Sequence, residues 1–156
     1  MKHFPAIALC ALLLWLLCRV GFGGQLGSRE YVPVELNWQG KILRALALQD
    51  TGNTLRDPLT GESVLVCGAD VGEELLHLPR SAFLNPAETL ASGMLPGARL
   101  IPYRAVGQPG SMLLAIRLTN VKIGAHRTGV LVAFAPHEIA KGEAYRILTG
   151  GIGCTG

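Results

Sequence analysis

Short apolar runs, separated by glycine, proline and polar residues, dominate the sequence after Ser28. Runs of about four to eight such residues between turn signals are typical of β-strands, whereas amphipathic helices repeat their apolar positions every three or four residues. We therefore expect a mainly β domain, and the close spacing of the runs predicts a small barrel or a sandwich. The expected strands are Tyr31 to Leu36, Ile42 to Leu48, Val64 to Cys67, Arg99 to Val106, Met112 to Ile123, Gly129 to Phe134 and Ala144 to Leu148.

The first two expected strands flank residues 37–40, a turn cluster of hairpin length. This arrangement predicts an antiparallel β-hairpin. Pro33 has no main-chain N–H to donate to a neighbouring strand, so we expect its strand to lie at the edge of the sheet.

Helical signals are few and short. Asp70, with a glutamate three positions later, resembles a capping box that opens a helix ending at Leu76. Asn85 before Pro86 has the chemistry of a helix N-cap followed by a first-turn proline. One or two short helices are therefore expected beside the strands.

The N-terminal segment is apolar and uncharged from Phe4 to Cys18, a run of fifteen residues. This length falls between the core of a signal peptide and the roughly 17 to 25 residues of a membrane-spanning helix. Val20 and Phe22 extend the run if the Arg19 side chain reaches back to the lipid headgroups.

We expect residues 4–22 to anchor the protein in a cell membrane as a single span. Residues 1–29 would then be the anchor and its linker, and residues 30–156 one folded domain. Arg19 and Arg29 follow the apolar run and Lys2 precedes it, which favours a cytoplasmic location for that domain, although the positive amino terminus nearly cancels this charge bias. The alternative is removal of the segment as a signal peptide, which would give a secreted protein.

Composition narrows the class of protein. Charged residues make up 16% of the chain, against an average of roughly 25%, and 49% of residues are hydrophobic, which excludes a disordered chain. The net charge of +3 is spread without a dense basic block, so no nucleic-acid partner is expected. Cys67 and Cys154, the cysteines beyond the apolar segment, lack metal-ligand spacing. We expect free thiols, no disulfide, no metal site and no cofactor.

The candidate chemistry lies where the second expected strand ends in Asp50, Thr51 and Gly52. An aspartic protease presents its catalytic acid in this way: Gly52 allows a tight turn, and the Thr51 hydroxyl can bond across to a partner loop. Peptide hydrolysis of this type needs two carboxylates that share one proton. One acid activates water while the other polarises the scissile carbonyl group.

The sequence supplies one copy of this motif. The other two aspartates, Asp57 and Asp70, are not followed by Thr-Gly or Ser-Gly. The second acid must then come from a second chain, because a two-fold axis brings the same residue of both subunits together. We therefore expect a homodimer centred on Asp50. The triplet alone is also typical of an ordinary β-turn.

The residues around the triplet are more specific. Residues 50–61 read Asp-Thr-Gly-Asn-Thr-Leu-Arg-Asp-Pro-Leu-Thr-Gly, which resembles the active-site signature of the sporulation sigma-E factor processing peptidases, the SpoIIGA family. A second block, Ile-Pro-Tyr-Arg-Ala-Val-Gly at residues 101–107, is similar to the other recognisable segment of that family. Gly110 and an apolar run at residues 112–116 follow it. The resemblance covers residues 31–148.

This resemblance implies a retropepsin-like aspartic protease, in which a small closed barrel forms one lobe of a homodimer. It also implies a membrane-bound enzyme whose catalytic domain lies in the cytoplasm of the mother cell. Its substrate would be a sigma factor precursor that loses an N-terminal pro-sequence, and its activator a signalling protein from the forespore. By the motif match, Asp50 carries over as the catalytic acid and Thr51 and Gly52 as its supporting loop.

Asn53, Asp57 and Arg104 are the expected substrate-binding residues. Asp57 before Pro58 also fits a turn opener or a carboxylate that pins the loop. Arg104 can pin that carboxylate, contact substrate or remain a solvated charge. Residues 107–110 fit either a flap over the cleft or a simple hairpin connection.

Two features depart from the family pattern. Members carry several N-terminal spans, whereas this chain has room for one, so a shortened relative, a misassigned start and a fragment all stay open. Residues 147–153 also differ from the usual ending, which leaves the last strand and the dimer contacts open.

A second class of function stays open as well: a catalytically silent, membrane-anchored β-domain that binds a partner protein. In that case the Asp-Thr-Gly triplet is only a turn. His77, His126 and His137 lie in unrelated contexts without a serine or cysteine nucleophile signature, so no catalytic triad is expected.

Overall fold

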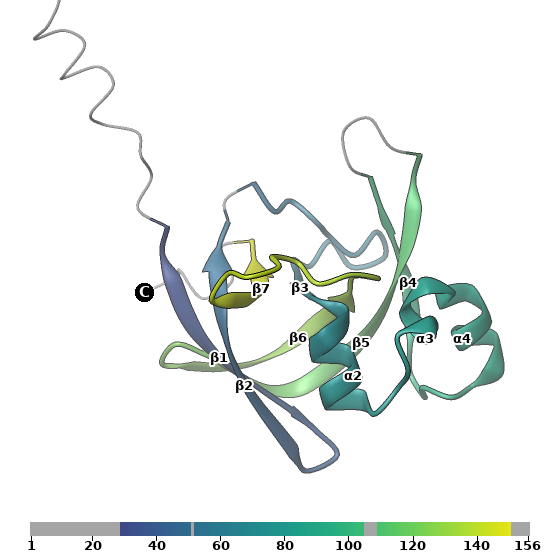
Figure 1. The fold of residues 1–156 in the computed structure, drawn as a ribbon, viewed down its shortest axis with the longest axis horizontal. Coiled ribbons are helices and arrows are strands. Elements are labelled where there is room, and N and C mark those ends of the chain that lie inside the picture. Colours follow the sequence, from purple (N-terminus) through teal and green to yellow (C-terminus); the bar gives the residue numbers. More distant parts are fainter. Residues whose placement is uncertain (1–28, 51, 105–108, 151–156) are drawn as a thin grey trace, which may run out of the picture.

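A computed structural model of the protein describes residues 29–50, 52–104 and 109–150. These residues form one sheet with the strand order β1-β2-β7-β3-β6-β5-β4, in which β1 also pairs with β5. Six strands therefore close a barrel, and β4 lies outside the ring along β5 (Figure 1). The strands are β1 (Tyr31–Trp38), β2 (Lys41–Gln49), β3 (Val64–Cys67), β4 (Arg99–Tyr103), β5 (Ser111–Ile123), β6 (His126–Phe134) and β7 (Tyr145–Thr149). The expected mainly β closed barrel is confirmed.

The predicted antiparallel hairpin is present, with a tighter turn than expected. Trp38 lies opposite Lys41, so Gln39 and Gly40 alone make the turn. Both have positive φ, 49° and 84°, as a two-residue turn that follows the twist of its strands requires. Gly40 adopts this conformation without steric strain.

The edge position predicted for Pro33 is wrong. β1 pairs with β2 on one side and with β5 on the other. The ladder to β5 reaches Val34, and beyond it the Pro33 oxygen accepts a hydrogen bond from the Gly124 N–H at 2.9 Å. The nitrogen and oxygen of one strand residue point to the same side, so the missing N–H faces a turn rather than a paired strand.

Three helices follow β3 on one side of the barrel: α2 (Ala69–Leu76), α3 (Ser81–Leu84) and α4 (Pro86–Ser92) (Figure 1). Asn85 occupies the N-cap position of α4, as predicted, but its side chain makes no cap hydrogen bond; α3 is a single turn that has no signal in the sequence. The capping box predicted at Asp70 is wrong, because Gly68 is the N-cap of α2 and makes no side-chain cap. Asp70 instead bonds Arg146 of β7 at 2.5 Å.

Two apolar clusters hold these elements together. The larger one fills the barrel and packs under the helices, where the rings of Phe83 and Phe134 lie 5.5 Å apart. Alternation along β5 and β6 places a smaller cluster on their other face: Val64, Ile101, Leu113, Ala115, Leu131 and Ala133. Leu55, from the loop after β2, packs against it. This loop therefore covers apolar surface as well as connecting two strands.

Several expectations fall outside the described residues: the anchor at residues 4–22, Thr51, the end of the strand expected to reach Val106, and part of the turn at 107–110. Among the described residues, no helix is long and apolar enough to cross a membrane. Cys67 is fully buried with a free thiol, and burial raises its pKa. It packs as the small apolar side chain expected from the sequence.

Candidate active site

β2 delivers Asp50 to one end of the barrel. Leu43 and Ala47 on this strand point into the core, with 3% and 0% of their surfaces exposed, so the strand is fixed along its length. Gln49 pairs with Thr149 of β7 in a parallel register. The Asp50 N–H then donates to the Thr149 oxygen at 3.0 Å. The acid therefore leaves the barrel at a point where two strands fix the main chain.

The turn after Asp50 holds its carboxylate. Asp50 Oδ1 accepts a hydrogen bond from the Gly52 N–H at 2.8 Å, and the Asp50 main-chain oxygen accepts one from the Asn53 N–H at 3.0 Å. This is the local pattern by which an aspartate side chain closes a turn on the main chain two residues ahead. It fixes one carboxylate oxygen and leaves the half-buried residue at the surface of a single chain.

Asn53 supports the same loop from within. Its amide oxygen accepts the Leu55 N–H at 3.2 Å, and its amide nitrogen lies 3.5 Å from the Val64 oxygen. Both groups are main-chain atoms of the loop and of the strand that follows it. The side chain expected to contact substrate thus also braces the loop of Asp50.

The three aspartates differ in their ionic partners. Asp57 pairs with Arg99 at 2.7 Å and Asp70 pairs with Arg146 at 2.5 Å. Asp50 has no ion-pair partner within residues 29–50, 52–104 and 109–150. A carboxylate that must exchange a proton with water during a reaction needs this freedom, because a bound arginine would hold it ionised.

Asp57 is buried, and its side chain faces the loop rather than the solvent. Its Oδ1 accepts the Leu59 N–H at 3.0 Å, and its Oδ2 accepts the Thr60 hydroxyl at 3.0 Å and the Arg99 guanidinium. The hydrogen bond from the Leu59 N–H, then that from the Thr60 hydroxyl and the positive charge of Arg99, lower the pKa of the Asp57 carboxyl despite its burial. This geometry favours the loop-pinning interpretation of Asp57 over a direct substrate contact.

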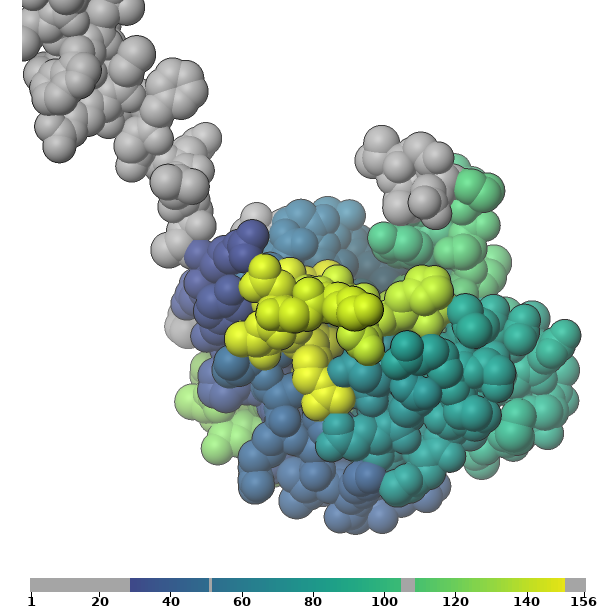
Figure 2. All heavy atoms as spheres, in the orientation of Figure 1, coloured from purple at the N-terminus to yellow at the C-terminus, as the bar shows by residue number. Residues whose placement is uncertain are grey.

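Arg104 follows β4 and is exposed, and it lies beside Gly110, the residue just before β5. It is not the arginine that holds Asp57, because Arg99 takes that place. The loop after β2 nevertheless runs toward the β4–β5 hairpin (Figures 1 and 2), and its later residues Asp57 and Glu62 pair with Arg99 and Arg117 of that hairpin. Tyr103, 40% exposed, lies on the same face of β4 as Arg99 and Ile101, the face that carries the ion pair.

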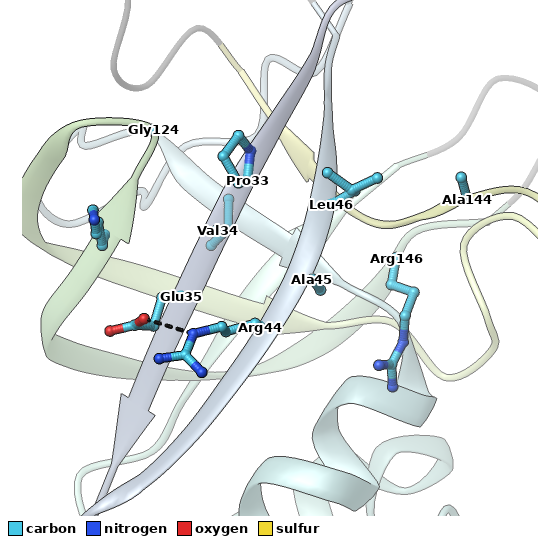
Figure 3. Close-up of a pocket in the computed structure, with 10 residues that line it drawn as sticks. Pro33, Val34, Glu35, Arg44, Ala45, Leu46, Gly124, Ala144 and Arg146 are labelled. Atoms are coloured by element: carbon cyan, nitrogen blue, oxygen red, sulfur yellow. Dashed lines mark hydrogen bonds and ion pairs between the residues drawn. The ribbon is translucent and has the colours of Figure 1, made fainter.

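A groove of about 550 Å³ lies elsewhere, on the outer face of β1 and β2 (Figure 3). Pro33, Glu35, Arg44 and Leu46 line it, and Glu35 and Arg44 form an ion pair at 3.0 Å. None of the expected site residues that the structure describes borders this groove. In the described part of the chain, no group of three or more His, Cys, Asp or Glu side chains is placed to hold a metal ion.

Comparison with known proteins decides the family. The model of the sporulation factor SpoIIGA family matches residues 3–150. The chain belongs to this family. The family resemblance read from the two sequence blocks is therefore confirmed, and the match extends over the described barrel.

Two curated relatives agree with this assignment. The chain is similar to the sporulation sigma-E factor-processing peptidase of Priestia megaterium, with 31% identity over 100 residues, which are 60% of this chain and 33% of that protein. It is also similar to the peptidase of the same name from Bacillus subtilis, with 30% identity over 102 residues, again 60% of this chain and 33% of that protein. The aligned part thus spans about a third of each SpoIIGA relative. No solved structure matches the chain.

The sequence interpretation missed two groups at this site. Thr149 was outside the expected last strand, which ended at Leu148, although its oxygen holds the Asp50 N–H. Arg99 was not considered as the partner of Asp57. The alternation of side chains along β4 could have indicated Arg99, because it lies on the same face as the buried Ile101. Arg104, three positions after Ile101, would fall on the opposite face.

Proposed function

We propose that this barrel is one half of a homodimeric aspartic endopeptidase, with Asp50 as the acid that each subunit contributes. The observation that carries the proposal is the state of Asp50. It is the one aspartate that follows a barrel strand, is held by main-chain bonds to Gly52 and Thr149, and has no ionic partner among the described residues. Asp57 and Asp70 are both bound to arginines, so the second acid comes from a second subunit.

In the proposed dimer, the two Asp50 carboxylates share one proton around a water molecule. The ionised acid takes a proton from the water, and the protonated acid donates a hydrogen bond to the scissile carbonyl oxygen. The supporting loop of Thr51 and Gly52 keeps the two acids within reach of each other. Asn53 and Arg104 are the proposed substrate contacts, and Asp57 acts through the loop. The β4–β5 hairpin would border the cleft.

We propose a sigma-E precursor as the substrate, because both curated relatives are named as sigma-E factor-processing peptidases. The reaction would remove its N-terminal pro-sequence. We also propose that residues 4–22 anchor the enzyme in the cell membrane with the barrel in the cytoplasm, and that a signalling protein activates it. The family match begins at residue 3 and so includes this apolar segment.

Replacing Asp50 tests the catalytic role. Asp50→Asn retains the shape of the side chain and its acceptor oxygen but removes the ionisable group. We expect the variant protein to remain folded and to be unable to cleave a sigma-E precursor. The assay uses purified precursor and the full chain reconstituted in membranes. Glu88→Gln, on the exposed surface of α4, is the matched control and keeps full activity. Cleavage by Asp50→Asn at the rate of the control would refute the protease and support a silent binding domain.

A further inference from the structure

Two arginines, one from each strand of the β4–β5 hairpin, hold the loop that follows Asp50. Arg99 of β4 lies 2.7 Å from Asp57, and Arg117 of β5 bonds Glu62. Arg99 pairs with Ala115, so Arg117 is its diagonal neighbour on the same face of the two strands. The two ion pairs therefore attach one loop to both strands of the hairpin.

The loop itself is closed between these two ion pairs. The Asp57 N–H donates to the Glu62 oxygen at 2.9 Å, and the Gly61 N–H donates to the Asp57 oxygen at 2.8 Å. The Thr60 hydroxyl lies 3.0 Å from the Asp57 carboxylate and 3.2 Å from that of Glu62. Residues 57–62 thus form one compact unit, and we call this unit together with Arg99 and Arg117 the clamp.

The clamp connects to the loop of Asp50 through a short series of contacts. The Val64 N–H donates to the Leu55 oxygen at 3.0 Å, and Leu55 packs on the apolar cluster that includes Ile101 of β4. The Leu55 N–H in turn binds the Asn53 side chain, and the Asn53 N–H binds the Asp50 oxygen. These contacts form the path along which a shift of the clamp would reach the main chain of Asp50.

Burial of an ion pair is a poor way to gain stability, because two well-packed apolar side chains often serve as well. An ion pair does impose one geometry, since the carboxylate must meet both the guanidinium and its other donors. The Asp57 side chain is fully buried, with three hydrogen-bond donors on its two oxygens. This arrangement fixes the position of the loop at residues 57–62 more effectively than it raises the free energy of unfolding.

We propose that the clamp is a positioning device that sets the loop of Asp50 against the β4–β5 hairpin. Asp57 and Arg99 are then positioning residues rather than substrate contacts. The inference rests on the proposed function for its catalytic consequence, but the mechanical coupling between the clamp and Asp50 is independent of that function.

The test compares Asp57→Asn, Arg99→Gln and the double variant of the full chain. Amide hydrogen exchange over residues 49–56 measures the order of the Asp50 loop, and kcat and KM for precursor cleavage measure its function. Arg44→Gln is the matched control, because it removes an arginine from an exposed pair with Glu35 on β1, away from the loop. Thermal melting shows that each variant is folded at the assay temperature.

We expect exchange over residues 49–56 to rise by about tenfold or more in both single variants, with no further rise in the double variant. We expect kcat to fall by about tenfold with a smaller rise in KM, because the acid and Asn53 are misplaced together while the proposed contact from Arg104 remains. The control should match the wild type in both readouts. A purely structural pair would lower the melting temperature and leave exchange near Asp50 and kcat per folded molecule unchanged.

Unchanged exchange over residues 49–56 in the folded Arg99→Gln protein would overturn the proposal. If this variant does not fold, Glu62→Gln removes the more exposed half of the clamp and must produce a smaller rise in exchange; no rise would again overturn it. A wild-type protein without peptidase activity refutes the proposed function alone, because hydrogen exchange still decides whether the clamp positions the loop.

Discussion

The main-chain oxygen of Asn53 lies 2.3 Å from the point where a β-carbon on Gly150 would stand. The loop of Asp50 is therefore pressed against the main chain just beyond β7, and only a residue without a side chain fits there. The Asp50 N–H also donates to the Thr149 oxygen. The end of β7 therefore fixes the main chain of the Asp50 loop at two points.

Gly150→Ala should therefore displace the Asp50 loop. The atom in the way belongs to the main chain and cannot rotate aside, so we expect a loss of about 1–3 kcal/mol in the free energy of unfolding, typical of overpacking. Cleavage of the precursor should fall on the order of tenfold or more, because small displacements of an active-site group have large effects on rate. Urea unfolding and a cleavage assay measure the two effects.

Gly129→Ala is the control for this substitution. A β-carbon there would meet its nearest neighbour, the Leu118 oxygen, at 3.6 Å, an ordinary contact. We expect little change in stability or activity. Equal behaviour of the two alanine variants would show that the close approach at Gly150 does not constrain the loop.

Mixing subunits tests whether each chain supplies one acid. Co-expression of wild-type and Asp50→Asn chains in equal amounts should give three kinds of dimer, of which only the wild-type homodimer holds two acids. Activity per dimer should then be about one quarter of the wild-type value for random pairing. One half of the wild-type activity would mean that each chain works alone. Separate purification of the mixed dimer through two affinity tags completes the measurement.

The clamp should also shape the response to acid. The pKa of Asp57 is lower in the folded protein than in the unfolded chain, mainly through its bond from the Leu59 N–H. The ionised form thus stabilises the fold above the unfolded pKa of about 4, and this contribution is lost as the pH falls through the lower folded value. Asp57→Asn should be less stable than the wild type at pH 7 and should lose less stability as the pH falls below about 4.

Urea unfolding across this pH range, with Glu88→Gln as the control, measures the difference in slope. The control should retain the acid dependence of the wild type, because Glu88 lies on the exposed first turn of α4. Parallel curves for Asp57→Asn and wild type would contradict a lowered pKa at Asp57.

Gly72 in α2 offers a test of the packing under the helices. A β-carbon there would lie 2.4 Å from the Phe83 ring and 3.0 Å from the Phe134 ring, and the two rings pack against each other. Alanine favours a helix over glycine by about 1 kcal/mol, yet overpacking costs about 1–3 kcal/mol, so we expect Gly72→Ala to be neutral to destabilising by about 2 kcal/mol. Adding Phe83→Leu should make the alanine better tolerated than it is beside phenylalanine. A double-mutant cycle by thermal unfolding without such coupling would rule out the clash.

The sequence allowed the local elements to be predicted better than their partners. Val64 to Cys67 matched β3 at both ends, because a short apolar run between turn residues has few other solutions. The closing pair of β1 and β5 had no signal, since it joins residues almost ninety positions apart, such as Val34 and Ile123. Register between distant strands depends on the packing of the whole core rather than on any local pattern.

The same limit applied to the site. Asp50 was identified from its neighbours in the chain, because strand, acid and glycine are consecutive residues. The partners of Asp57 and the support from Thr149 come from β4 and β7, so they became visible only in the fold. The residues next to Asp50 in the chain did not indicate which distant main-chain atoms bind it.

β7 lies between β2 and β3 in the sheet, although it is the last strand in the chain and comes long after both of them. During synthesis on the ribosome, the segment that carries Asp50 emerges long before the strand that supports it. Until residues 145–149 are inserted, the ring is open and the Asp50 N–H lacks the Thr149 acceptor. A chain that stops short of β7 would therefore present Asp50 on a strand whose main chain lacks one of its two neighbours in the ring.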